Sequence, residues 1–145
     1  MTAGGAQRPK RVYLDTSGYL CMLLAQDGWQ RVFQLTEEAE ILSSVLLVLE
    51  SRRNLIRLAR QGALTPAQYQ ACMERIEADT TRFALRDLML ELCSSNRVPA
   101  VATPRSLDLV HLRTALWFHA SEPIDRFVTM DTSQEAAAKE LGLPV

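Results

Sequence analysis

Two aspartates near opposite ends of the chain lie in nearly the same local sequence. Asp15 is at the centre of residues 13–17 (YLDTS), and Asp131 is at the centre of residues 129–133 (TMDTS). Each follows a short apolar run that favours a β-strand, and each precedes hydroxyl residues that can cap a helix. Ligands of open α/β sheets bind outside the carboxyl ends of the strands. If these strands are neighbours, about 4.8 Å apart, both carboxylates face one cleft; the alternative is that each aspartate only caps its helix.

Two further acids occur where the apolar periodicity of their predicted helices does not favour a charge. Glu50 follows the apolar run 45–49, so its carboxylate must be paired, hydrated or bound to a metal ion. Asp108 falls in the first turn of a predicted helix, with apolar neighbours at 107, 109 and 110. An acid in a first turn is also stabilised by the helix dipole, which leaves a purely structural alternative for Asp108.

These four carboxylates together predict divalent-cation chemistry. Four carboxylates around one cleft repel each other, and without a cation some are pushed toward protonation. Mg²⁺ or Mn²⁺ removes this conflict, because hard cations prefer oxygen ligands and keep several bound waters. One such water can act as a nucleophile while the ion stabilises charge on a phosphoryl oxygen. We therefore predict phosphodiester hydrolysis, with Asp15, Glu50 and Asp108 as the primary ligands and Asp131 completing the site or orienting a water.

The elements that must position these acids alternate between strand and helix, which favours a mainly parallel sheet covered by helices. Strands are predicted at 11–14, 41–44, 83–85 and 127–130, and 143–145 could add a fifth. Helices are predicted over 18–26, 29–38, 45–60, 66–82, 88–96, 106–120 and 132–141. The start signals are capping boxes at Thr65–Gln68 and Thr132–Glu135 and a cap at Ser106.

Length and composition restrict the class of protein. With 145 residues, 48% hydrophobic and 23% charged, the chain has the size and balance of one globular domain. We expect a flexible lead-in over 1–10 and a single domain over 11–145. Residues 1–11 lack the apolar core of a secretory signal, and the longest apolar run, 19–25, is too short to span a membrane. A cytoplasmic protein without a membrane partner is expected, with Cys21, Cys72 and Cys93 as reduced core thiols.

The motifs around the four acids also match a known family. The chain resembles PIN-domain ribonucleases, and more narrowly the VapC-type toxins of toxin–antitoxin pairs, over nearly its whole length from Val12 to Val145. The motifs that carry the resemblance stand in order at fitting separations: 14–17 (LDTS), 49–53 (LESRR), 106–115 (SLDLVHLRTA), 127–131 (FVTMD) and the tail 136–145 (AAAKELGLPV).

The resemblance implies a three-layer α/β/α sandwich with a central, mainly parallel sheet of four or five strands. It implies a Mg²⁺- or Mn²⁺-dependent endoribonuclease that forms a homodimer and is inhibited by a cognate antitoxin. Asp15, Glu50, Asp108 and Asp131 would be its metal-binding acids, with Ser17 as a polar helper. One departure is that Ser133 stands where many relatives place a further acid, two residues after the last aspartate.

Basic residues follow Glu50 along one face of the same predicted helix. Arg53, Arg57 and Arg60 recur at spacings of three and four residues, which places them in one stripe. This stripe could guide an RNA backbone into the cleft. The alternative is a solvated face with an ion pair between Glu50 and Arg53.

A histidine lies one turn after Asp108 on the same helix face. His111 could act as a general base, but a hydrogen-bonded packing role is favoured, because a metal-bound water needs no imidazole. In the first two helices, four side chains are candidates for contact with a second copy or an antitoxin, although core burial explains them equally well: Leu20, Leu23, Leu24 and Phe33.

Two other functions compete with the nuclease. A PIN-like fold could keep its acids and serve as an RNA-binding or interaction module without turnover; such a module would retain RNA affinity in EDTA. An α/β phosphatase or phospho-acceptor could use Asp15 as its nucleophile. That chemistry usually needs a second Asp two residues later, where this chain has Ser17.

Overall fold

The computed structural model describes residues 5–94, 101–103 and 105–145. Four strands and seven helices lie within that part of the chain. The strands are β1 (Arg11–Leu14), β2 (Glu40–Ser44), β3 (Ala84–Arg86) and β4 (Arg126–Val128). The helices are α1 (Thr16–Leu23), α2 (Trp29–Thr36), α3 (Leu46–Arg60), α4 (Pro66–Thr80), α5 (Leu90–Ser94), α6 (Ser106–Ser121) and α7 (Thr132–Glu140).

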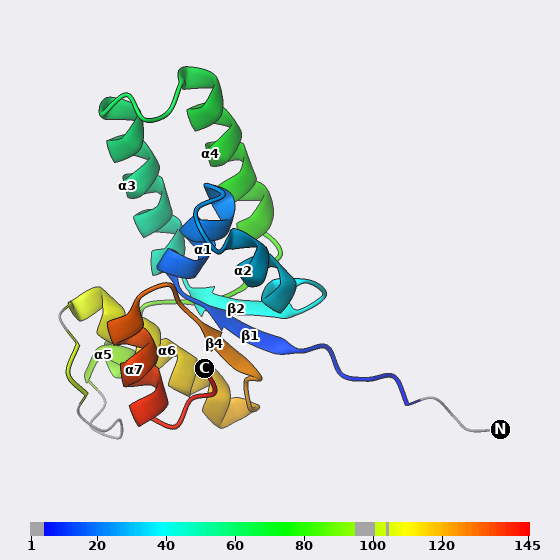
Figure 1. The fold of residues 1–145 in the computed structure, drawn as a ribbon. Helices are drawn as coiled ribbons and strands as arrows, with labels where there is room; N and C mark the ends of the chain where they lie inside the picture. Colours follow the sequence, from blue (N-terminus) through cyan, green and yellow to red (C-terminus); the bar gives the residue numbers. More distant parts are fainter. Residues whose placement is uncertain (1–4, 95–100, 104) are drawn as a thin grey trace.

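The four strands form one parallel sheet in the order β3-β2-β1-β4. Helices α1 to α4 lie on one side of this sheet, and α5 to α7 lie on the other (Figure 1). Helices α3 and α4 form a hairpin that extends beyond the sheet (Figure 1). The predicted α/β class with a parallel sheet of four strands is confirmed, and the arrangement is compatible with the expected three layers.

Strand β1 shows why both faces of the sheet are covered. Val12 and Leu14 belong to the core under α1 to α4, whereas Tyr13, between them, belongs to the core under α6 and α7. All three side chains are essentially inaccessible to solvent. Alternate side chains of a strand point to opposite faces, so a strand buried on both sides reads as a continuous apolar run.

Three helices begin at the predicted residues, but only one of their three predicted caps is observed. The capping box of Thr65 and Gln68 is confirmed, with hydrogen bonds of 2.9 and 3.2 Å. The predicted cap at Ser106 is wrong, because Ser106 is already helical and Arg105 stands before it. The predicted box at Thr132 is also wrong: Asp131 caps α7 through the backbone N–H groups of residues 133 and 134.

Other boundary predictions differ by a few residues. Helix α1 begins at Thr16 rather than Gly18, because Asp15 caps it, and it ends at Leu23 rather than residue 26. Residues 143–145 form no strand; a single hydrogen bond of 2.6 Å joins the Phe127 N–H to the Pro144 carbonyl. The predicted end of the fifth helix at residue 96, and most of the loop expected before Arg105, lie outside the described residues.

Arg8 and Lys10, in the segment before β1, and Arg11, at its start, contact the rest of the protein; the Lys10 carbonyl accepts the Glu40 N–H at 2.7 Å. Arg8 forms ion pairs with Glu122 and with Asp125, the latter at 3.5 Å, and all three side chains are about half exposed. Arg11, at the start of β1, is buried and lies 3.4 Å from Glu40. Exposed ion pairs contribute little stability, so the flexibility expected of the lead-in stays a prediction.

The three cysteines are free, but they are not all in the core. Cys21 is buried, Cys72 is half-buried and Cys93 is exposed on α5, so the prediction of three core thiols is wrong for Cys93. In the five-residue helix α5 the neighbouring Leu92 is the buried side chain instead. Among the described residues, no helix has both the length and the apolar character needed to cross a membrane.

Gly18 allows α1 to pack closely against the sheet. A Cβ atom at this position would lie 2.8 Å from Leu14 Cδ1 and 3.2 Å from the carbonyl oxygen of Val128. We expect Gly18→Ala to reduce the free energy of unfolding by roughly 1–2 kcal/mol, because the clash outweighs the higher helix propensity of alanine. Urea unfolding measures the change, and Gly5→Ala, where a Cβ meets no atom within 4 Å, is the control. A Gly18→Ala protein as stable as the wild type would contradict this packing.

Candidate functional site

Strand pairing brings the two similar aspartate motifs together. Strands β1 and β4 are parallel neighbours, with Leu14 opposite Val128, and the Asp15 N–H donates to the Val128 carbonyl at 3.1 Å. Asp15 follows β1 directly, and Asp131 follows β4 by three residues. Both therefore lie at the carboxyl edge of the sheet, as the sequence predicts for neighbouring strands. Both also cap helices, so the two interpretations of these residues are compatible.

Asp15 is held by the first turn of α1. Its Oδ1 accepts hydrogen bonds from the Ser17 hydroxyl at 2.7 Å and from the Gly18 N–H at 2.9 Å, and the side chain is buried. Burial raises the pKa of Asp15 above its usual value, and hydrogen bonds to Thr129, Gly18 and Ser17 offset only part of that rise. The fold thus holds a carboxylate where its ionised form is penalised.

Glu50 reaches the same region from α3. Its Oε1 accepts a hydrogen bond from the Thr16 hydroxyl at 2.8 Å and lies 2.9 Å from His111 Nε2. Burial acts to raise the pKa of Glu50, but the hydrogen bond and charge of His111, together with Thr16, lower it overall. The ion pair considered between Glu50 and Arg53 does not form within the described residues; His111 is the partner of this carboxylate.

Asp108 lies in the first turn of α6, and the negative charges of the other three acids repel its carboxylate. Its pKa is raised by burial first and then by repulsion from Asp131, with smaller contributions from Asp15 and Glu50. The helix dipole favours an ionised acid there, so burial and repulsion outweigh it. This shared repulsion is the clearest sign that the four acids occupy one electrostatic neighbourhood.

Asp131 and Gln134 connect the first turn of α7 to that of α6. Asp131 Oδ1 accepts from the backbone N–H groups of Ser133 and Gln134, at 2.8 and 3.3 Å. The buried Gln134 side chain then donates to the carbonyl oxygen of Asp108 at 2.8 Å. Sequence reasoning missed Gln134, and its polarity among three alanines of α7 was the available signal.

The donor set fits a hard divalent cation, although the side chains do not form a closed metal site. Within the described residues, no three His, Cys, Asp or Glu side chains are grouped so as to hold an ion. Instead, Asp15, Glu50 and Asp131 each accept two hydrogen bonds on a single carboxylate oxygen. A carboxylate anchored through one oxygen can offer the other to a ligand. A bound Mg²⁺ or Mn²⁺ would offset the repulsion between these carboxylates, because such cations prefer oxygen ligands.

A cleft of about 440 Å³ borders this group of acids, and Asp131 is the one of the four that lines it. Ser17 and Asp131 line it from the sheet edge, and Asn54 and Arg57 line it from α3. Arg57 donates to the Asn54 and Gln61 side chains, each at 3.2 Å. Arg53 and Arg60 are exposed and do not line the cleft, so the structure places one member of the predicted arginine stripe in it.

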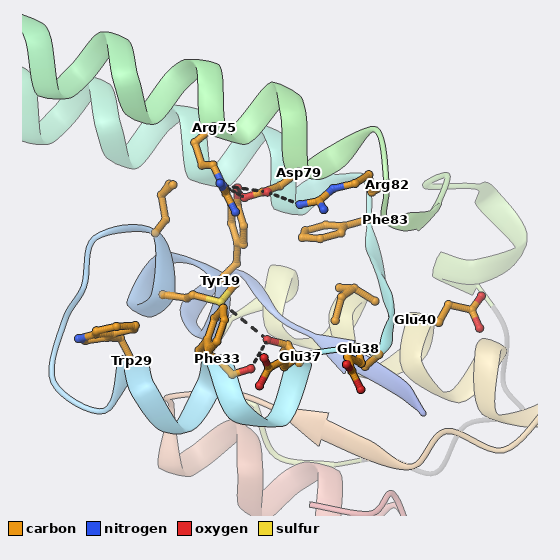
Figure 2. A pocket seen from close by; sticks show the side chains of 15 residues that line it. Tyr19, Trp29, Phe33, Glu37, Glu38, Glu40, Arg75, Asp79, Arg82 and Phe83 are labelled. Atoms are coloured by element: carbon orange, nitrogen blue, oxygen red, sulfur yellow. Dashed lines mark hydrogen bonds and ion pairs between the residues drawn. The ribbon is translucent and has the colours of Figure 1, made fainter. Parts of the chain in front are cut away.

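A second and larger pocket, of about 720 Å³, is lined by residues of α1, α2, α4 and the start of β2, and none of the four acids lines it (Figure 2). Trp29, Phe33 and Phe83 line it, and Phe33 is 47% exposed. The buried Asp79, at the edge of this pocket, accepts a hydrogen bond from the Tyr19 hydroxyl at 2.9 Å. It also accepts from Arg75, on α4, and from Arg82, just after α4, each at 3.0 Å.

His111 is confirmed as a buried, hydrogen-bonded side chain. It is 2% exposed, and its two ring nitrogens contact Tyr13 Oη at 2.8 Å and Glu50 Oε1 at 2.9 Å. Sequence reasoning did not identify Tyr13 or Thr16 as neighbours of the site. Their positions on either side of Leu14 and Asp15 were the only signal in the sequence.

Comparisons with known proteins do not assign the chain to a family. Neither a scan against protein-family models nor a search of curated proteins found a match. The resemblance to PIN-domain ribonucleases is therefore carried by the sequence motifs, and membership of that family stays a prediction. The observed parallel sheet and the shared electrostatics of the four acids are the structural facts on which a function can be argued.

Neutralising Asp108 should stabilise the metal-free protein at neutral pH. The pKa of Asp108 is higher in the folded chain than its usual value, so the folded state holds this proton more tightly. Stability is therefore lost as the pH rises through the folded pKa, and Asp108→Asn removes that loss. We expect a larger free energy of unfolding for the variant at pH 7 in EDTA, and no such gain below about pH 3.9, the usual Asp value.

Urea unfolding at both pH values measures this effect. Glu135→Gln, which removes an exposed acid from the first turn of α7, is the matched control and should give no gain. Added Mg²⁺ should stabilise the wild type more than Asp108→Asn, because an ion that binds only the folded state adds to its stability. A variant that is less stable than the wild type at pH 7 would contradict the assignment.

Proposed function

We propose that this protein is a Mg²⁺- or Mn²⁺-dependent endoribonuclease of the PIN type, acting as the toxin of a VapBC-like pair. The observation that carries the proposal is the placement of Asp15 and Asp131 at the carboxyl edge of a parallel sheet, where Glu50 bonds to Thr16 and the Asp108 backbone bonds to Gln134. The pKa of Asp108 is raised by burial and then by repulsion from the other acids. The order of the sequence motifs around these acids supports the same function. Several acids at one edge reduce the stability of the fold, because they repel each other. Such an arrangement is expected where the function requires a cation.

Each acid has a defined role in this proposal. Asp15, Glu50 and Asp108 would hold the cation, and Asp131 would complete the site or orient a water. A bound cation supplies an activated water and stabilises charge on the phosphoryl oxygen. The chain's own contribution is to fix the carboxylates: Ser17 and Gly18 hold Asp15, and the backbone of α7 holds Asp131.

The cleft beside the acids suits a strand of RNA. Its lining includes the Arg57 guanidinium of α3 as well as Ser17 and Asp131 of the sheet edge, so a basic and an acidic side chain share the cleft. Leu20, Leu24, Leu58 and Met130 supply apolar surface against which a base or sugar can pack. Arg57 would contact a phosphate, since guanidinium groups bind phosphate oxygens in a bidentate manner.

An interaction module without turnover is the second candidate. Glu50 Oε1 is already satisfied by Thr16 and His111, and the described acids do not form a closed ion site as they stand. These two observations also fit a protein that binds RNA without cutting it. Such a module would bind RNA equally well in EDTA and in Mg²⁺, and it would show no cleavage in either.

The partners in this proposal are an RNA substrate, a second copy of the chain and a cognate antitoxin. Helices α1 and α2 are the candidate contact elements. Leu23 and Phe33 lie in the wall of the 720 Å³ pocket, whereas Leu20 and Leu24 lie in the cleft beside the acids. The first pair is therefore available to a protein partner, and the second pair belongs to the proposed RNA path.

Asp15→Asn should abolish RNA cleavage while the protein stays folded. The asparagine amide keeps a carbonyl oxygen that can accept from Gly18 and Ser17, but it loses the charge that binds the cation. We expect the cleavage rate with Mg²⁺ or Mn²⁺ to fall more than about 100-fold, because even outer partners of metal ligands cost about 10–100-fold. Asp27→Asn, an exposed acid on the loop before α2, should keep full activity.

Cleavage of a labelled RNA on a gel, together with circular dichroism of each variant, provides the measurement. RNA binding without cleavage by the wild type, unchanged in EDTA, would reject the nuclease and favour the interaction module. Retained cleavage in Asp15→Asn would remove this residue from the metal site.

Replacing Arg57 and Arg60 with Gln should weaken RNA binding. In an Asp15→Asn background, which prevents cleavage, we expect lower affinity and a salt dependence shallower by about 0.7 for each phosphate that the variant no longer neutralises. A double variant with the same change of charge elsewhere, Arg31→Gln with Lys139→Gln, is the control. Fluorescence anisotropy across a range of salt concentrations measures both quantities, and unchanged affinity and slope would exclude the guiding role.

A further inference from the structure

We propose that His111 is a positioning residue that, together with Thr16, fixes which oxygen of Glu50 is available to the cation. This inference rests on the proposed function, because it takes Glu50 as a metal ligand. It assigns His111 neither a bond to the metal nor a proton transfer to the substrate. It assigns a hydrogen bond that holds the Glu50 carboxylate in one orientation.

The hydrogen bonds form a continuous network across four elements. Tyr13 on β1 contacts His111 Nδ1 at 2.8 Å, and His111 Nε2, from α6, contacts Glu50 Oε1 on α3 at 2.9 Å. Thr16, at the start of α1, donates to the same Oε1 at 2.8 Å and lies 3.1 Å from His111 Nε2. The position of the Glu50 carboxylate is thus defined from both the sheet and the helices.

The protons of this network can be assigned from its surroundings. Burial raises the pKa of Tyr13 well above its usual value, so its hydroxyl keeps its proton. The pKa of Glu50 is lowered, so its carboxylate is ionised and its oxygens can only accept hydrogen bonds. In the 2.9 Å contact with Glu50 Oε1 the N–H therefore belongs to His111 Nε2.

Both donors converge on the same oxygen of Glu50. Thr16 and His111 each bond to Oε1, and neither bonds to Oε2. Rotation of the carboxylate would break both bonds, so Oε1 is fixed and Oε2 is the oxygen left for an external ligand. Partners that orient a ligating carboxylate in this way contribute substantially to metal affinity.

The imidazole itself is held in a rigid setting. Tyr13 stacks on Phe127 with ring centroids 5.3 Å apart and an angle of 1° between the rings, and it packs edge-on against His111 at 5.9 Å. Because aromatic contacts restrict the Tyr13 ring, its hydroxyl defines a fixed point for His111 Nδ1. The orientation of Glu50 is in this way set by the packing under α6.

Direct measurement of Mn²⁺ binding tests this role. By isothermal titration calorimetry, we expect His111→Leu to weaken Mn²⁺ binding by about 10-fold or more, in the range for outer partners of metal ligands. His111→Gln, whose amide can place an N–H near the position of Nε2, should recover most of that affinity. Thermal unfolding of each variant in EDTA reports separately on the fold.

The outcomes separate this inference from the proposed function. Wild-type affinity in His111→Leu, or equal losses in the Leu and Gln variants, would overturn the positioning role and leave the nuclease proposal standing. Absence of Mn²⁺ binding by the wild type would overturn both. If His111→Gln recovers Mn²⁺ affinity and both variants unfold at similar temperatures, the positioning role is supported. A side chain that only fills space would not make Gln, which has an N–H donor, differ from Leu, which has none.

A second measurement applies if His111→Leu does not fold. In wild-type protein labelled with ¹⁵N-histidine, the ring nitrogen shifts should show a protonated Nε2, and Glu50→Gln should change the Nε2 shift more than Glu135→Gln does. An unprotonated Nε2, or an equal response to both variants, would overturn the assignment without any metal present.

Discussion

The pairing of β1 with β2 on one side and β4 on the other is the constraint on which the candidate site depends. It places the ends of β1 and β4, strands separated by more than a hundred residues in the chain, at one edge. It also places Tyr13 and Leu14 on opposite faces of the sheet, so that β1 contacts both helical layers. Glu50 and Asp108 lie in the first two turns of α3 and α6, and contacts with Thr16 and Gln134 hold these turns at the same edge.

Electrostatics at that edge work against the fold. Asp15 and Asp108 both have raised pKa values, because burial penalises their charge and, for Asp108, the other acids repel it. Glu50 is the exception, since His111 and Thr16 compensate its burial and lower its pKa. Hydrogen bonds and charge therefore offset the burial of Glu50, but they do not offset the burial of Asp15 and Asp108. Such an imbalance is characteristic of a site whose charge is completed by a ligand.

Local sequence patterns were sufficient to predict the four observed strands and the α/β class of the fold. The bounds of β1 follow directly from an apolar run that ends at an acid, and the capping box at Thr65 and Gln68 marks the start of α4. The helix starts at Asp15 and Asp131 were harder to place, because an acid that could bind metal could equally cap a helix. Residues 143–145 have strand-like composition, yet only one backbone hydrogen bond to β4 forms there.

The partners of the site residues could not be predicted, because they are distant in sequence. His111 and Glu50 are 61 residues apart, and no periodicity within either helix indicates that their side chains meet. An ion pair of Glu50 with Arg53 was the local alternative, and tertiary packing replaced it with His111. The gathering of the four acids was predictable as a pattern, whereas the oxygens that each of them uses depend on three-dimensional contacts.

The two aspartate motifs are also joined to each other through hydroxyl groups. The Ser17 hydroxyl lies 3.1 Å from that of Thr129 and accepts the Met130 N–H at 2.9 Å, so one motif supports the backbone of the other. Residues that share such partners do not respond independently to substitution. Evolution of the two motifs would therefore be coupled, and the serine of the first would restrict which residues the second can accept.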